Sequence, residues 1–272
     1  ALNSGQLINI TRGTGDIDVF IELQHSLFAN HSRPNLFDGY GGSVLVLSGN
    51  ATVACTVHVL AVNNTFSNNT AQNGGVMLVA AGQSSNITLE LQDNQFLNNN
   101  AYSGGGVFFL GTMDFSQIRM NCTSNVFDGN TATIGGVLQM GSNSGSCGVD
   151  LLFDKNLMQN NMAGNTGSVM MIFINGGSSN DLTINFTNCQ LYNNRALDGG
   201  VLWSQIGDLS NQSLHMIANQ IVNNSASRIG GIVCHSGSGN SERLDVQLED
   251  NLFQNNTANG GSLLWFDSTS GT

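Results

Sequence analysis

One motif recurs along the whole chain, and its spacing limits the fold to a repeat architecture. The pattern is N-x-F-x-N-N-x-A, followed by a few polar residues, a Gly-Gly pair and an apolar run, and its clearest copy runs from Asn64 to Ala80. A fixed period of about 20 to 50 residues is the signature of solenoids, propellers and repeat arrays. The apolar anchor of the motif recurs every 30 to 33 residues, at Phe66, Phe96, Phe127, Met158, Leu191, Ile221 and Phe253.

The glycine pair is a second marker with the same period. Because two separate markers keep one spacing, we treat residues 1–272 as a single repeat domain; a solenoid is one domain whatever its length. The first glycine of each pair lies at Gly41, Gly74, Gly105, Gly135, Gly167, Gly199, Gly230 and Gly260.

Each period contains three strand-like pieces, and no window has the apolar spacing of a helix. In one copy, Ile87, Leu89 and Leu91 alternate with polar residues, which is typical of a strand with one buried and one solvated face. We therefore expect an all-β fold, a right-handed parallel β-helix of about eight three-strand rungs of ~31 residues, without a capping helix.

The parts of the motif have separate physical roles in such a coil. The apolar anchor points inward and stacks on its equivalents in neighbouring rungs, and the glycine pair supplies a positive φ at the next corner. The Asn three positions after the anchor tolerates the left-handed conformation, and its amide can bond the rungs above and below as a ladder. The predicted ladder is Asn69, Asn99, Asn130, Asn161, Asn194, Asn224 and Asn256.

This combination resembles the passenger repeats of the chlamydial polymorphic outer-membrane protein family, which carry Phe-x-x-Asn and Gly-Gly-Ala-(Ile/Leu/Val). Phe66–Asn69, Phe96–Asn99, Phe127–Asn130 and Phe253–Asn256 match the first motif. Gly-Gly-Val at Gly74, Gly105, Gly135 and Gly199 matches the second, with Val in place of Ala. The resemblance covers most of the chain and implies a surface-exposed β-helix used in adhesion or as a stalk.

Charge and hydropathy exclude two classes of partner. Charged residues make up 9% of the chain, against about 25% in ordinary soluble domains, and the net charge is −11. No cluster of Lys or Arg supplies the positive patch that nucleic-acid binding requires. No apolar run reaches the ~18 residues of a membrane span. We therefore expect no nucleic-acid partner and no membrane span in this segment.

The chain lacks a recognisable pattern for catalysis, a metal or a cofactor. The acids are scattered in the repeat: Asp128 lies one residue after its anchor and Asp198 seven after its own, so they are not stacked in one column. A glycosidase needs two facing carboxylates, and the five His residues have no short metal-ligand spacing. We predict no enzyme activity and no cofactor.

Five cysteines, at Cys55, Cys122, Cys147, Cys189 and Cys234, leave an odd thiol if the others pair. Their positions in the repeat favour buried, unpaired thiols in the core. A bridge between Cys122 and Cys147 stays open, although the repeat positions do not support it.

Asn-x-Ser/Thr acceptor sequences for N-linked glycans are frequent. Four of them, at Asn30, Asn68, Asn223 and Asn255, share the position two residues after the anchor. Such sequences accept glycans in secreted chains and at exposed positions, so we expect an extracellular or cell-surface location with several sites occupied. The candidates are Asn9, Asn30, Asn50, Asn63, Asn68, Asn86, Asn121, Asn185, Asn211, Asn223 and Asn255.

The ends of a β-helix are open sheet edges, and neither terminus has a capping helix pattern. The sequence begins without an initiator Met or signal peptide, as in a mature form or an excised segment. We interpret residues 7–10 and 17–23 as second-strand pieces and residues 262–266 as a first-strand piece, so that the last rung is completed by what the first begins.

These features lead to one functional hypothesis and two alternatives. The first is a secreted, glycosylated structural β-helix whose copies stack head to tail in an extracellular filament, stalk or coat. The second is an adhesin passenger domain that binds cells or surfaces, which an exposed aromatic ladder would favour. The third is a polysaccharide lyase or hydrolase, which requires acids converging on one groove.

Overall fold

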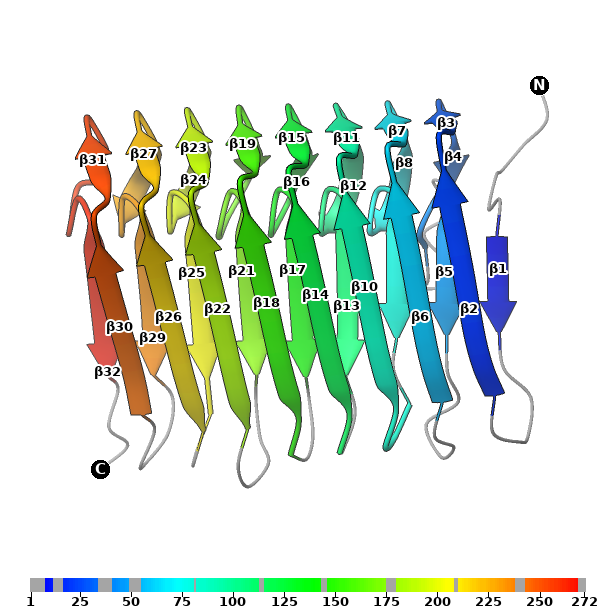
Figure 1. Ribbon diagram of the computed structural model, residues 1–272. Coiled ribbons are helices and arrows are strands. Elements are labelled where there is room, and N and C mark those ends of the chain that lie inside the picture. The colour runs from blue at the N-terminus through cyan, green and yellow to red at the C-terminus, as the bar shows by residue number, and fades with distance from the viewer. Residues whose placement is uncertain are drawn as a thin grey trace.

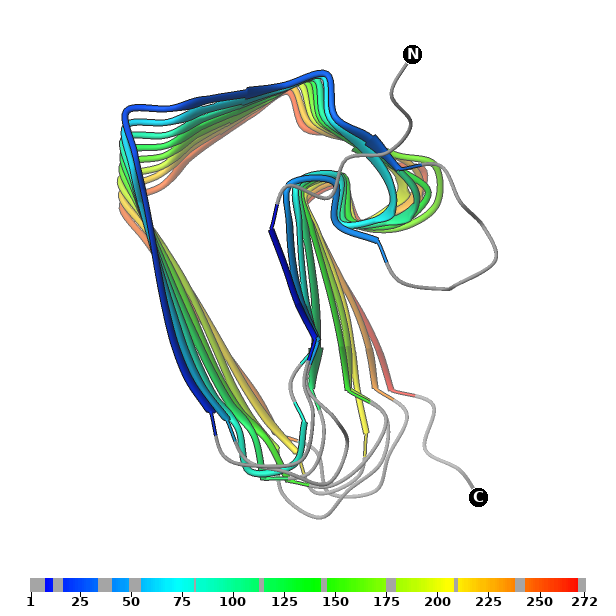
Figure 2. The ribbon, with the colours of Figure 1, turned by 90° about the vertical axis from the view of Figure 1, so that its right-hand side faces the viewer.

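The protein is described by a computed structural model that covers residues 8–11, 17–33, 41–48, 55–80, 82–112, 115–142, 146–174, 180–207, 210–237 and 243–268. Within these ranges the chain forms strands and turns and contains no helix. The predicted fold class is confirmed: parallel strands stack side by side into a β-solenoid (Figure 1). Seen along its axis from the N-terminal end, the coil runs clockwise as it recedes, so it is right-handed (Figure 2).

Four parallel sheets run along the coil, and we name them A to D. Sheet A contains β1 (Ile8–Thr11), β5 (Leu45–Ser48), β9 (Met77–Ala80), β13 (Phe108–Thr112), β17 (Leu138–Ser142), β21 (Met170–Ile174), β25 (Leu202–Ile206), β29 (Val233–Gly237) and β32 (Leu264–Ser268). Sheet B contains β2 (Ile17–Gln24), β6 (Cys55–Val62), β10 (Asn86–Gln92), β14 (Gln117–Thr123), β18 (Gly148–Asp154), β22 (Asp181–Thr187), β26 (Asn211–Ile217) and β30 (Arg243–Glu249).

Sheets C and D lie at the opposite end of the cross-section from the C-terminal ends of the sheet A strands, and each strand of sheet C has three residues (Figure 2). Sheet C contains β3 (Leu27–Ala29), β7 (Thr65–Ser67), β11 (Gln95–Leu97), β15 (Val126–Asp128), β19 (Leu157–Gln159), β23 (Gln190–Tyr192), β27 (Gln220–Val222) and β31 (Leu252–Gln254). Sheet D contains β4 (Ser32–Arg33), β8 (Thr70–Asn73), β12 (Asn100–Gly104), β16 (Thr131–Ala132), β20 (Met162–Ala163), β24 (Arg195–Asp198) and β28 (Ser225–Ile229).

The expected three-strand rung is wrong, because a typical turn has four strands and the fourth belongs to sheet D. Its strands span two to five residues, too few for an alternating pattern to be visible in the sequence. Among the described residues, sheet D has seven strands, so turns with all four sheets are also fewer than the expected eight. The Ala of the motif belongs to this sheet: Ala71 and Ala101 are buried in adjacent turns, where the chain curls back toward sheet A.

The core lies between sheets A and B and is closed by the anchors of sheet C. Inward residues of sheet B such as Leu89 are fully buried, and outward ones such as Glu90 are half-buried or exposed. Phe66, Phe96 and Phe127 form a column with ring centroids 4.9 Å apart and nearly parallel planes. The period of the anchor thus corresponds to the spacing of adjacent strands in a parallel sheet, about 4.8 Å.

The two glycines of each pair are needed for different reasons. Gly74 has a φ of +59°, which L-residues with a side chain rarely adopt. A Cβ on Gly75 would lie 2.0 Å from the carbonyl oxygen of Gly106 in the next turn. The residue that replaces glycine at the equivalent position of another turn is small, Ser168, and its hydroxyl donates to the Gly200 carbonyl. The expected first glycine is wrong by one residue in the first and last copies: the strand register places Gly42 rather than Gly41 opposite Gly74, and Gly261 rather than Gly260 has the positive φ, of 58°.

Candidate functional site

Each turn has two corners at which one residue adopts the left-handed conformation and the next residue is buried. The second corner follows sheet C: Asn68 has a φ of 54° and an exposed side chain, and Asn69 is fully buried. The first corner precedes sheet C, where Asn63, with a φ of 53°, is followed by buried Asn64. The exposed residue turns the chain, and the buried residue is free to bond along the axis.

The seven asparagines of the predicted ladder lie in one column at the second corner. At Asn130, Nδ2 donates to the Phe96 carbonyl (2.9 Å) and to Asn161 Oδ1 (3.0 Å). Its own Oδ1 accepts from the backbone N–H and the Nδ2 of Asn99, both at 3.0 Å. The same pattern links Asn69, Asn99, Asn130, Asn161, Asn194, Asn224 and Asn256.

The left-handed conformation belongs to the residue before each ladder Asn, which corrects our assignment of it to the ladder Asn itself. Asn98, Asn160 and Asn193 have φ values of 53° to 55°, and Gly129 has 66°. A left-handed corner residue directs its side chain outward here, whereas the ladder amide must point inward. One residue cannot do both, so the repeat uses two in succession.

A second ladder, which the sequence analysis missed, runs along the first corner. Asn94 donates from Nδ2 to the Ala61 carbonyl (2.8 Å) and to Asn125 Oδ1 (3.1 Å). In the sequence, these residues are the first Asn of N-x-F. Because Asn is common in turns, this position alone does not indicate a ladder. This ladder contains Asn64, Asn94, Asn125, Asn156, Asn219 and Asn251.

Cys189 takes the place of an Asn in this second ladder. Its backbone N–H donates to Asn219 Oδ1 (2.8 Å), but its Sγ lies 4.0 Å from Asn156 Nδ2, where other turns have an amide oxygen. Sulfur is a weak acceptor, so the ladder is weakest at this turn.

We expect Cys189→Asn to stabilise the protein by about 1 kcal/mol, because it replaces a weak acceptor with an amide oxygen and restores a buried hydrogen bond. Thermal unfolding measures this as a rise of about 3 °C for a domain of this size. Cys122→Val is the control, because Cys122 is equally buried but lies outside the ladder. An equal rise in both variants would mean that removal of a thiol, not the ladder, is responsible.

The acceptor asparagines for glycans lie on the outside of the coil wherever their side chains are described. Asn30, Asn68, Asn223 and Asn255 are the exposed left-handed residues of the second corner, with φ of 53° to 60°. Asn63 has the same place at the first corner. Asn86 and Asn211 are exposed and Asn121 and Asn185 half-buried, all on the outer face of sheet B. Asn9 lies in β1, and Asn50 lies outside the described residues.

In the turn formed by residues 243–268, side chains that point into the core are exposed at the end of the coil. The inward residue Leu248 is 39% exposed, whereas its partner in the preceding strand, Met216, is fully buried. Leu263 and Phe266 are 40% and 48% exposed. The backbone N–H groups of Asn251 and Asn256 have no acceptor among the described residues, although their equivalents Asn219 and Asn224 have one. This turn therefore presents apolar surface, ladder donors and unpaired strand edges.

The opposite end begins in a different sheet from the one we expected. Residues 8–11 form β1, which pairs with β5 in sheet A and is not a second-strand piece. Sheet A consequently has nine strands and sheets B and C have eight each. Consider a second copy stacked against β32 with its own β1 still paired to its β5. Sheet A would continue from β32 into that β1, but sheets B and C would each lack one strand at the junction. The expectation that the last rung is completed by the first is therefore wrong for the chain with β1 docked.

The buried ionisable groups are held in structural contacts. Asp198 is buried and accepts from Arg228 Nε at 2.7 Å. Burial raises the pKa of Cys189 to about 11 and that of Cys234 to about 12, so both thiols are protonated at neutral pH and are poor nucleophiles. No disulfide joins any two of the five cysteines, all of which lie within the described residues. Within the described ranges, no three His, Cys, Asp or Glu side chains gather closely enough to hold a metal ion.

One buried histidine makes the stability depend on pH. His235 points into the core from β29, and Nδ1 lies 2.9 Å from Ser204 Oγ. Burial lowers the pKa of His235 to about 4 from an ordinary value of 6.5. Between these two values the unfolded chain binds a proton that the folded chain does not, so stability falls as the pH falls.

We therefore expect the protein to lose about 2 to 3 kcal/mol of unfolding free energy through this group between pH 7 and pH 4. Urea unfolding at both pH values should show a smaller loss in the double variant His235→Met with Ser204→Ala, because Met140 occupies the same inward column. His215→Gln, on the outer face of sheet B, should keep the wild-type dependence. The same pH dependence in the double variant would rule out His235 as its source.

Comparisons with protein-family models, curated proteins and solved structures found no match for this chain. The resemblance to the chlamydial passenger repeats thus stays a prediction. Within the described residues, no helix has the length and apolar character needed to cross a membrane.

Proposed function

We propose that the protein is a structural β-solenoid that extends along its axis by contact with further copies of itself, in a filament, stalk or coat outside the cell. The observation that carries the proposal is the exposed core at residues 243–268. Leu248, Leu263 and Phe266 are each 39% to 48% exposed, although the equivalent residues one turn earlier are buried. Unpaired strand edges beside apolar surface favour addition of another parallel turn.

The hydrogen-bond ladders favour head-to-tail contact. In both ladders the backbone N–H of one turn donates to the Asn Oδ1 of the next, so these backbone donors all point toward the C-terminal end. The exposed turn therefore needs acceptors from its neighbour. In the first turn, Ser26 and His31 occupy the two ladder positions. Each has a side-chain atom that can accept a hydrogen bond. If two C-terminal ends met instead, the backbone N–H donors of one copy would face those of the other and find no acceptor.

Continuous stacking requires β32 of one copy to take the place of β1 in the next. With β1 released, β32 pairs with β5 of the neighbour, and β30 and β31 then lie directly against β2 and β3. Sheets A, B and C then continue without a gap, because sheet A contributes eight strands per copy, as sheets B and C do. β1 is suited to release, because it has four residues and a single partner strand.

Sedimentation and electron microscopy of the purified chain test the assembly itself. We expect rods that lengthen with concentration, and a loss of at least tenfold in assembly for Leu248→Glu, which places a charge on the exposed core. Leu152→Glu is the matched control, because Leu152 is 36% exposed but lies on the outer face of sheet B in the middle of the coil. A wild-type chain that stays a uniform monomer at all concentrations would exclude the proposal.

A disulfide across the first two strands of sheet A tests the exchange separately. Thr11 and Ser48 are paired in register, so a Thr11→Cys, Ser48→Cys variant can join β1 to β5 when oxidised. The oxidised variant should stay monomeric and the reduced one should assemble. Assembly that is unaffected by oxidation would reject the exchange but keep the stacking proposal.

Glycosylation and the extracellular location are supported by the outward position of every acceptor Asn whose side chain is described. Intact mass before and after enzymatic deglycosylation of native material measures occupancy; a single unchanged mass would remove this part of the proposal. Nothing in the described residues specifically favours the adhesin; for the polysaccharide enzyme, the acids that share one hollow are Asp150 and Asp181. The exposed aromatic residues form no ladder, because Phe20 lies in sheet B, Tyr102 in sheet D, Phe115 before β14, and Trp265 and Phe266 in β32.

A further inference from the structure

We propose that the outer face of sheet B contains a binding trough for a neutral oligosaccharide that lies along the axis of the coil. Two hollows with volumes of about 370 and 240 Å³ open on this face. Both are lined by Gln117 and Asp150, so they adjoin, and together they cross β10, β14, β18 and β22. The larger one is within the usual size of small-molecule sites, about 300 to 1,000 Å³.

The trough exists because one outward position lacks a side chain. Asn86, Gln117, Gly148 and Asp181 are paired in one outward column of sheet B. A Cβ on Gly148 would lie 2.0 Å from Gln117 Oε1 and 2.7 Å from its Cδ, so the flexible amide of Gln117 lies over this glycine, at the border that the two hollows share.

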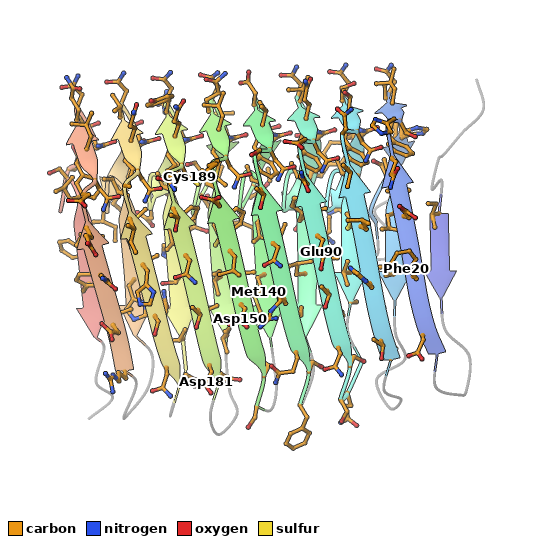
Figure 3. The ribbon with its side chains drawn as sticks, in the orientation of Figure 1. Phe20, Glu90, Met140, Asp150, Asp181 and Cys189 are labelled. Carbon is orange, nitrogen blue, oxygen red and sulfur yellow. The ribbon has the colours of Figure 1, made fainter. Side chains whose placement is uncertain are left out.

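The groups around the depression suit a ligand rich in hydroxyls. Asp150 and Asp181 point out from the face of sheet B (Figure 3), and Thr183 and Gln117 complete the polar lining. Carboxylates and amides form paired hydrogen bonds, and neighbouring hydroxyls on a sugar ring offer donors and acceptors at the matching separation. These groups recur at the strand spacing of about 4.8 Å, so they can bond successive units of an extended chain.

An aromatic wall and the charge restrict the ligand further. Phe115 lines the larger hollow and is 68% exposed, held in a left-handed turn with a φ of 59° directly before β14. An exposed aromatic ring can pack against the apolar face of a sugar. The single cation of the trough, Arg119, is paired with Asp150 at 3.3 Å. The two carboxylates leave the trough with net negative charge, so acidic sugars are disfavoured. The site is independent of the end-to-end contacts proposed above.

The test uses the complete chain produced in bacteria, so that no attached glycan occupies the face. Saturation-transfer NMR and calorimetry measure binding of hexasaccharides of cellulose, chitin and β-mannan, with hexagalacturonate as the acidic probe. We expect at least one neutral hexasaccharide to bind and hexagalacturonate not to bind. Phe115→Ala and Gly148→Gln should each weaken binding at least tenfold, the first by removing the wall and the second by filling the hollow.

Leu152→Gln is the control, because Leu152 lies on the same strand as Gly148 and faces outward beyond the trough. It should bind as the wild type does. Thermal unfolding of each variant checks that it is folded. If Gly148→Gln does not fold, the binding affinity of Phe115→Ala alone tests the proposal. Absence of binding by all three neutral probes would overturn the proposal. So would binding that is stronger for hexagalacturonate, or that survives Phe115→Ala unchanged.

Discussion

Asn130→Ala is expected to reduce the free energy of unfolding by about 5 kcal/mol, because several buried polar groups lose their partners at about 1–3 kcal/mol each. The amide of Asn130 accepts two hydrogen bonds from Asn99 and donates to the Phe96 carbonyl and to Asn161. All of these groups are fully buried. Removal of one amide therefore interrupts the ladder on both sides of the turn.

Urea unfolding of unglycosylated protein measures this loss. Asn86→Ala is the control, because Asn86 is exposed at the start of β10, and exposed substitutions of this kind usually change stability by less than about 0.5 kcal/mol. An Asn130→Ala variant within 1 kcal/mol of the wild type would mean that water replaces the amide and that the ladder is not a main source of stability.

Phe96→Ala is the second large effect, with an expected loss of about 5 kcal/mol from the cavity and from the broken ring stack. Phe96 is fully buried and stacks at 4.9 Å on both Phe66 and Phe127. It also meets the edge of Phe108 across the core at 5.2 Å. Adjacent turns fix the backbone on either side, so collapse into the space is restricted.

The chain provides its own control for this substitution, because Leu191 occupies the same column in a later turn. Phe96→Leu should cost only about 1.5 kcal/mol or less. Equal losses for the alanine and leucine variants in urea unfolding would show that the aromatic stack, not the filled volume, stabilises this column.

The period, the sheet direction and the inward anchors could be predicted because each rests on a signal repeated seven or eight times. Sheet D could not, since strands such as Thr131–Ala132 are too short for alternation. The sheet of β1 was misassigned for a related reason: the four residues Ile8–Thr11 alternate in a way that fits sheet A or sheet B equally.

The two adjacent asparagines of the motif were harder to separate, because their side chains are chemically identical. One copy did contain the answer. In the sequence from Val126 to Asn130, Gly129 replaces the first Asn and the second is kept. Glycine is favoured at a left-handed residue, so the first position is the corner and the second the ladder. The binding trough had no sequence signal, because Gly148 is one of 34 glycines and only the strand register places it between Gln117 and Asp181.

Each inner turn of this coil contacts only the turns directly before and after it, at separations of 30 to 33 residues in sheet B except for the 38 between the first two turns. The entropy cost of adding a turn to an already folded neighbour is therefore the same at any point along the chain. Folding can begin at any adjacent pair and spread in both directions, and lengthening the coil adds steps without making any single step slower. The well-packed middle, with its Phe column and unbroken amide ladder, is where we expect folding to begin.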